Sequence, residues 1–150
     1  MTIVPERIMA EREHCPADAR AGVRELGRDE ILTAHHGGKL DITPSVPLDG
    51  ARDLSVAYSP GVAEVSRVIA ADASLTARYT WSERLVAVVS DGTAVLGLGD
   101  IGPAAALPVM EGKAALFSEF AGLNAIPIVL ASTDVDEIVE TVARIAPSFA

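Results

Sequence analysis

The sequence predicts an α/β domain with a largely parallel β-sheet flanked by helices. Two short apolar runs typical of buried strands, Leu85 to Val89 and Ile126 to Leu130, alternate along the chain with helical segments. Such alternation favours a parallel sheet, because a helix commonly connects parallel neighbours. Of the 150 residues 49% are hydrophobic but only 4% are aromatic, so the core is expected to consist mainly of Ala, Val, Leu and Ile.

The first part of the chain differs in pattern from the rest. Residues 1–28 mix five arginines with five acids and show no sustained period, so we interpret them as an N-terminal arm, helical or poorly ordered. Residues 29–150 form the predicted domain. It opens with a short helix over 29–35, which Gly37-Gly38 ends, and a short strand over 39–43.

The next elements are predicted from residues 54–69. Leu54, Val56 and Tyr58 alternate with small residues, which is typical of a strand. Ser59-Pro60 then indicates a helix start, with Ser as the N-cap, and apolar residues follow at helical spacing to Ile69.

The second half repeats this order of strand and helix. After the strand at Leu85, Asp91-Gly92 marks a turn, and Pro103 opens a helix that reaches Ala121 with a kink at Pro108. After the strand at Ile126, Thr133 and Asp136 resemble a capping box that begins a last helix.

Charge and cysteine content exclude several classes of function. The formal charge of −9 disfavours nucleic acid and anionic membranes as partners. The single cysteine, Cys15, excludes an internal disulfide and a cysteine-based zinc site. No apolar run approaches the length of a membrane span, and no secretion signal is recognisable, so we expect a soluble, cytoplasmic protein.

Lys113 is the strongest candidate for chemistry. The chain has twelve basic residues, of which only Lys39 and Lys113 are lysines. With about 100° of turn per residue, Lys113 falls in the middle of an apolar helix stripe that contains Val109, Leu116 and Phe120. An ammonium group in apolar surroundings has a lowered pKa, and the neutral amine could act as a base, which arginine could not. The alternative is a lysine whose ammonium group reaches the surface along its methylene stem.

Tyr58 is the second candidate. It lies at a predicted strand end just before a helix N-terminus, where negative charge is favoured. A phenol there could donate a proton and tolerate developing phenolate. The alternative is an ordinary tyrosine of the core or its rim.

Other patterns are weaker. The run Gly97 to Gly102 matches G-x-G-x-x-G, but the acid near the required distance, Glu119, lies within a predicted helix and cannot reach a ribose. His35-His36, Asp91 and Asp100 lie in turns without a cluster of partners, so we assign them no metal.

Three motifs resemble the bacterial malic enzymes. Asp53 to Ala63 (DLSVAYSPGVA) resembles the tyrosine signature of that family, Ser90 to Gly102 (SDGTAVLGLGDIG) its second signature, and Leu107 to Lys113 (LPVMEGK) its lysine motif. The likeness runs from about residue 29 to the end of the chain. It implies the malate-binding N-terminal domain of a small-type malic enzyme, truncated before the dinucleotide-binding domain.

The resemblance implies oxidative decarboxylation of malate to pyruvate and CO₂ with NAD or NADP and Mg²⁺ or Mn²⁺. Tyr58 is then the general acid and Lys113 the base. The metal and cofactor sites are expected beyond residue 150, in a homo-oligomeric enzyme, and the chain alone is expected to be inactive. Larger members of the family carry a malate-binding arginine where this chain has Ala94, which leaves that contact unassigned.

Three alternatives stay open: a silent fragment or interaction module, a malolactic-type domain that yields lactate, and a stand-alone dinucleotide binder built on Gly97 to Gly102.

Overall fold

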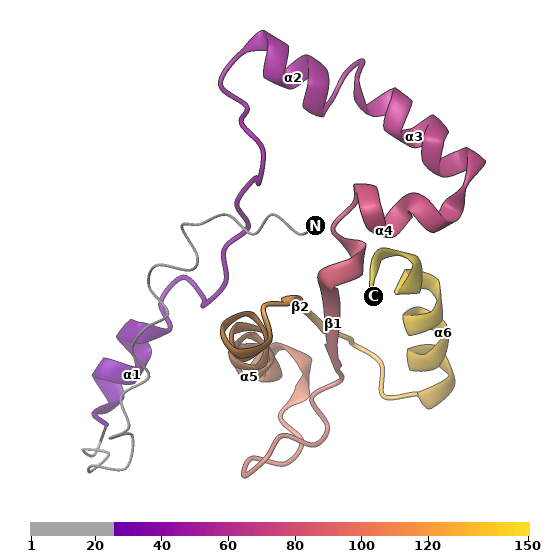
Figure 1. The fold of residues 1–150 in the computed structure, drawn as a ribbon. Coiled ribbons are helices and arrows are strands. Elements are labelled where there is room, and N and C mark those ends of the chain that lie inside the picture. Colours follow the sequence, from indigo (N-terminus) through magenta and orange to yellow (C-terminus); the bar gives the residue numbers. More distant parts are fainter. Residues whose placement is uncertain (1–25) are drawn as a thin grey trace. The chain divides into compact units, whose positions relative to one another are not determined.

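The computed structural model describes residues 26–150, which fall into two units divided between His36 and Gly37 (Figure 1). Helix α1 (Arg28–Ala34) belongs to the first unit and confirms the helix expected over 29–35. Nearly all of the predicted arm, residues 1–28, lies outside the described residues.

The second unit contains a β–α–β crossover that confirms the predicted parallel pairing. Strands β1 (Leu85–Ser90) and β2 (Asn124–Val129) pair in parallel, in a register that runs from Leu85 opposite Asn124 to Ser90 opposite Val129. Helix α5 (Gly102–Leu116) connects them and packs on both strands (Figure 1). A π-helical turn, η4 (Phe117–Ala121), extends α5, so the helical path reaches Ala121 as predicted.

Two alanines and a methionine form the buried face of α5 that packs on the strands. Ala106, Met110 and Ala114 recur every fourth residue and are 0%, 4% and 1% exposed. On the strand side Leu85 is 2% exposed, and burying one such side chain stabilises a fold by about 1.5–3 kcal/mol. Because alanine has almost no side chain, the helix backbone can lie close to the sheet.

Helix α6 (Val135–Ile145) lies on the other side of β1 from α5 (Figure 1). Asp134 is its N-cap and accepts a hydrogen bond from the Glu137 N–H, so the predicted pair Thr133 and Asp136 was wrong by one residue. After α6 a 3₁₀ turn, η5 (Ala146–Ser148), brings the Ala150 N–H to the Leu85 carbonyl at 3.0 Å.

The strand predicted over 54–58 is wrong. Residues Ala51–Ala57 form helix α2, and Asp53 near its start accepts a hydrogen bond from the Asp49 N–H. Leu54 and Val56 are 50% and 68% exposed. An alternation this short does not identify a strand unless a sheet buries one of its faces.

Helix α3 (Val62–Ala71) begins two residues later than the predicted Ser59-Pro60 start. Its N-cap is Gly61, and no side chain caps it. Three short elements follow, which the sequence did not predict: η2 (Ala73–Leu75), α4 (Thr76–Tyr79) and η3 (Ser82–Arg84).

The strand predicted over 39–43 is also wrong. These residues form neither a helix nor a strand, and they pair with no strand among residues 26–150. The Lys39 N–H, which would join a strand ladder, donates instead to the Glu111 carboxylate.

Candidate active site

Lys113 lies in α5, one turn after Pro108, but it is exposed. The face of α5 that is buried against the sheet is that of Ala106, Met110 and Ala114. Beside it, the predicted apolar stripe stays largely open, with Val109, Leu116 and Phe120 exposed by 40%, 57% and 79%. Lys113 thus lies on the predicted apolar stripe, but this stripe is exposed within the described residues, because the face of Ala106, Met110 and Ala114 meets the sheet.

The surroundings of Lys113 leave its ammonium group available. No hydrogen bond or salt bridge of its side chain is present within residues 26–150. Its neighbours on the open stripe, Val109 and Leu116, are apolar. The position can thus present an amine toward a ligand, and its role as a base remains a prediction.

Tyr58 ends helix α2 and is 72% exposed. The expected strand end is a helix end, but the expected proximity to a helix N-terminus holds, since the Tyr58 carbonyl accepts the Val62 N–H of α3 at 2.7 Å. Between the described residues no hydrogen bond links Tyr58 to Lys113, so their joint action also remains a prediction.

Gly61 explains part of the tyrosine motif. Its N–H donates to the Ser55 carbonyl at 2.8 Å, which folds the start of α3 back onto the end of α2. A Cβ at this position would lie 2.5 Å from the Val56 carbonyl oxygen and 2.6 Å from that of Ser55. The turn that carries Tyr58 therefore requires glycine, a constraint that the sequence analysis did not identify.

The second motif forms a closed loop between β1 and α5. Val95 and Gly99 exchange two backbone hydrogen bonds of 2.9 and 2.8 Å, and the Ile101 N–H donates to the Gly92 carbonyl. At Gly92, where φ is 78°, a Cβ would lie 2.2 Å from the Gly102 carbonyl oxygen. The loop is thus held by its own backbone.

An Asx turn fixes the start of this loop. Asp91 accepts hydrogen bonds from the Thr93 N–H at 3.1 Å and from the Thr93 hydroxyl at 2.8 Å. These two hydrogen bonds hold the pKa of the Asp91 carboxyl below its ordinary value, and the one from the Thr93 N–H has the larger effect. The negative charge of Asp91 therefore stabilises the turn.

The glycine-rich run does not present a phosphate cradle. A cradle needs backbone N–H groups directed at the ligand. Here those of Leu98 and Gly99 donate to the Val95 carbonyl, and that of Gly102 to the Asp100 carboxylate. These three N–H groups are thus engaged within the loop and are not directed at a ligand.

The acids and histidines do not assemble into a metal site within residues 26–150: no three of them come together. His35 Nδ1 lies 2.8 Å from the Ile31 carbonyl oxygen, so the side chain of His35 contacts the backbone at the end of helix α1. The described residues thus do not form the ligand set of the divalent metal that the resemblance implies.

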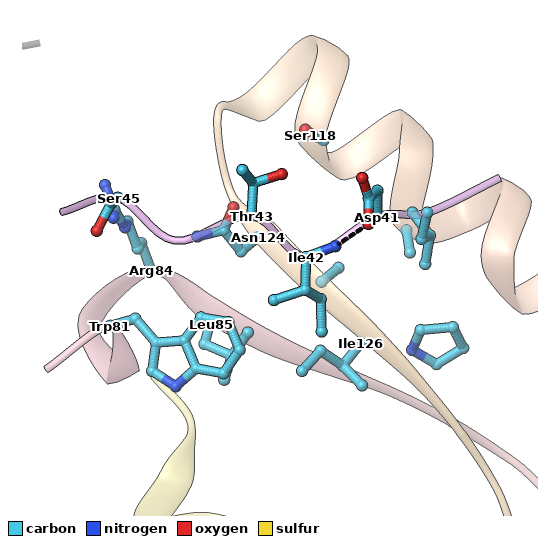
Figure 2. A pocket seen from close by; sticks show the side chains of 14 residues that line it. Asp41, Ile42, Thr43, Ser45, Trp81, Arg84, Leu85, Ser118, Asn124 and Ile126 are labelled. Atoms are coloured by element: carbon cyan, nitrogen blue, oxygen red, sulfur yellow. Dashed lines mark hydrogen bonds between the residues drawn. The ribbon is translucent and has the colours of Figure 1, made fainter. Parts of the chain in front are cut away.

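A cavity of about 330 Å³ lies at the amino-terminal ends of the strands (Figure 2). Figure 2 shows the apolar side chains of Trp81, Leu85 and Ile126 on one side, with Thr43 and Asn124 across from them. Neither Tyr58 nor Lys113 lines it. The cavity therefore does not bring the two sequence-predicted site residues together.

Among residues 26–150, none of the helices combines the length and the apolar composition that a membrane span requires.

Comparison with known proteins identifies similar chains. The family model for the malic enzyme N-terminal domain matches residues 37–141. The bifunctional malic/malolactic enzyme of Bacillus subtilis is 56% identical over 124 residues, which are 81% of this chain and 30% of the relative. The NADP-dependent malic enzyme of Halomonas elongata is 51% identical over 112 residues, or 75% of this chain and 26% of the relative.

A solved structure gives the same result for the fold. The malic enzyme of Pyrococcus horikoshii superposes with a TM-score of 0.79 at 45% identity, over 81% of this chain and 29% of that one. The present chain thus spans less than a third of the length of each of these three proteins.

Proposed function

This chain belongs to the malic enzyme family, and we propose that it supplies the malate-binding part of an enzyme that converts malate to pyruvate and CO₂. The observation that carries the proposal is the order of the three motifs within residues 53–113, inside the region that matches the family model. Two of these motifs carry a side chain suited to proton transfer, Tyr58 and Lys113.

We assign the proton transfers of the reaction to this chain. The Lys113 side chain accepts the proton of the malate 2-hydroxyl group as that carbon is oxidised. After CO₂ leaves, the Tyr58 hydroxyl donates a proton to C3 of the enolpyruvate, and pyruvate forms. Both side chains are exposed in the described structure, so each is accessible to a substrate.

The oxidant and the metal are assigned outside the described residues. Relatives are named as NAD-dependent or NADP-dependent malic enzymes, so we expect one of these cofactors, with Mg²⁺ or Mn²⁺. This chain matches only 30% and 26% of two relatives, so most of their length lies outside the match.

A chimera tests the proposal. Residues 37–150 of this chain replace the matching segment of the malic/malolactic enzyme of Bacillus subtilis, and malate, Mn²⁺ and NAD or NADP are added. We expect malate-dependent reduction of one cofactor, with pyruvate as the product. A folded chimera that binds cofactor but leaves malate unchanged would contradict the proposal.

A second candidate is the malolactic reaction, because the Bacillus subtilis relative is named for both activities. Product analysis of the same chimera separates the two reactions. If the chimera catalyses the malolactic reaction, lactate accumulates in place of pyruvate and there is no net reduction of the cofactor.

A further inference from the structure

Helix α5 contains a weak point one turn before Lys113. Pro108 has no N–H, so the Ala104 carbonyl cannot receive the usual hydrogen bond from four residues later. The part of α5 after Pro108 is therefore less firmly tied to the part before it. On the sheet side it is held by Met110 and Ala114, and alanine contributes little to fixing the rotation of a helix.

The segment just before residue 40 contacts α5 at this point. The Lys39 N–H donates to the Glu111 carboxylate at 3.2 Å, and Lys39 Nζ donates to the Pro108 carbonyl oxygen at 3.0 Å. A Cβ at Gly38 would lie 3.3 Å from Glu111 Oε1, and its φ of 83° is one that glycine tolerates best. Together Gly38, Lys39, Pro108 and Glu111 form what we call the α5 brace.

The geometry of the helix relates the brace to Lys113. Glu111 and Lys113 are two residues apart, which is about 200° around the helix axis. A contact at Glu111 therefore holds the helix from the side opposite Lys113. Rotation of the helix after Pro108 would break the Lys39–Glu111 bond and move the Lys113 amine in the same step.

We propose that Glu111 is a positioning residue, which through the α5 brace fixes the rotation of the helix and so the direction of the Lys113 amine. The last step of this inference, that the direction matters for turnover, rests on the proposed function. The brace itself is a property of the chain alone.

The first experiment uses the 150-residue chain and needs no activity. Amide exchange of Lys39 and the NMR signals of the Lys113 side chain are compared in wild type, Glu111→Ala, Glu111→Gln and Glu119→Ala. Glu119 is an exposed acid shortly after α5 whose side chain makes no hydrogen bond in the described part of the chain, so it is the matched control.

We expect Glu111→Ala to speed Lys39 exchange by about tenfold or more and to shift the Lys113 signals, because the acceptor of the Lys39 N–H is lost. Glu111→Gln keeps an acceptor oxygen and should retain most of the protection. Glu119→Ala should leave both unchanged. Unaltered Lys39 exchange or unaltered Lys113 signals in folded Glu111→Ala would overturn the inference.

The second experiment measures turnover in the chimera. Glu111→Ala should lower kcat by about tenfold with KM for malate changed less than threefold, and Glu111→Gln should restore most of kcat. A normal kcat in Glu111→Ala would overturn the positioning role. If the parent chimera itself is inactive, the proposed function fails, and the Lys113 signals in the isolated chain then decide the inference.

Discussion

Tyr58 and Lys113 are the two residues to which we assign proton transfer, and both side chains are exposed in the described structure. Tyr58 and Lys113 were selected from residue type and spacing. The strand end predicted for Tyr58 is wrong, because Tyr58 caps helix α2, and the apolar stripe that contains Lys113 is exposed within the described residues. The reason is physical: burial depends on which residues meet the sheet, and here the alanines of α5 do.

Tyr58→Phe tests the proposed general acid in the chimera. The phenylalanine keeps the ring but removes the proton donor, so turnover with malate should fall by about 10²- to 10⁴-fold. Decarboxylation of added oxaloacetate should survive better than ketonisation of the enolpyruvate product, which is followed by ultraviolet absorbance.

The other tyrosine provides the control for this variant. Tyr79 is half-exposed and lies against the Arg78 guanidinium, away from any assigned role. Tyr79→Phe should leave both rates near wild type. An equal loss of turnover in Tyr58→Phe and Tyr79→Phe would contradict the role of Tyr58 as the general acid.

Protonation of Asp91 makes the stability of the turn in the second motif depend on pH. Its pKa is lowered in the folded chain, so folding favours the carboxylate. The resulting stabilisation is complete above the pKa that Asp91 has in the unfolded chain. It is lost as the pH falls through the lower pKa that Asp91 has in the folded chain. Thr93→Val removes the hydroxyl donor and keeps the N–H, and we expect the pKa of Asp91 to rise toward its ordinary value.

Carboxyl NMR titration of the chain measures this rise. Ser74→Ala is the matched control, because the Ser74 hydroxyl and N–H lower the pKa of Asp72 in the same way, in a different turn. Ser74→Ala should raise the pKa of Asp72 and leave the pKa of Asp91 unaltered. An Asp91 pKa that does not respond to Thr93→Val would show that the hydroxyl contributes nothing.

At the scale of elements, the continuous apolar runs and the long helical patterns predict the correct elements, whereas the five-residue alternations do not. Both strands, the long helix between them and the last helix were predicted near their observed bounds, although no residue of β2 is buried. The strands expected over 39–43 and 54–58 were wrong, because five residues of alternation do not decide between a strand and a helix without a sheet to pair with. The capping shift to Asp134 is an error of one residue.

The loop between β1 and α5 makes a prediction about two glycines. Gly92 and Gly97 both have positive φ, 78° and 79°, so alanine is strained at each. Only at Gly92 would the added Cβ collide with backbone, that of Gly102 and Pro103, whereas nothing lies within 4 Å of a Cβ at Gly97.

We therefore expect Gly92→Ala to lower the free energy of unfolding by clearly more than Gly97→Ala. Backbone strain alone costs about 1–2 kcal/mol at each position, and the collision adds to it only at Gly92. Denaturant unfolding of the two variants measures the difference. Equal losses would show that the close approach at Gly92 relaxes without cost.

At the scale of the whole molecule, the core of the second unit lies at its β–α–β crossover, and many large apolar side chains of the described residues are exposed. The buried hydrophobic residues of the described part lie in β1, α5 and the loop between them, at Leu85, Val88, Val95, Ala106, Met110 and Ala114. Elsewhere large side chains such as Leu54, Leu116 and Phe120 are exposed, a surface composition that favours association.

The isolated chain is expected to lack both cofactor binding and turnover. In its glycine-rich loop the N–H groups of Leu98, Gly99 and Gly102 bond within the loop, so titration calorimetry with NAD or NADP should show no one-to-one binding. Addition of malate and Mn²⁺ should produce no reduced cofactor. A micromolar isotherm that Gly99→Val abolishes would instead place a dinucleotide site on this loop.

The measurement that tests the account most directly is the turnover of the chimera with Lys113→Arg. Arginine keeps the positive charge but cannot give up its proton, so it cannot accept the malate hydroxyl proton. We predict that kcat falls by about 10²- to 10⁴-fold across pH 6 to 9, with a much smaller change in KM for malate. Near-normal turnover over that range would contradict the account and leave Lys113 as a surface residue of α5.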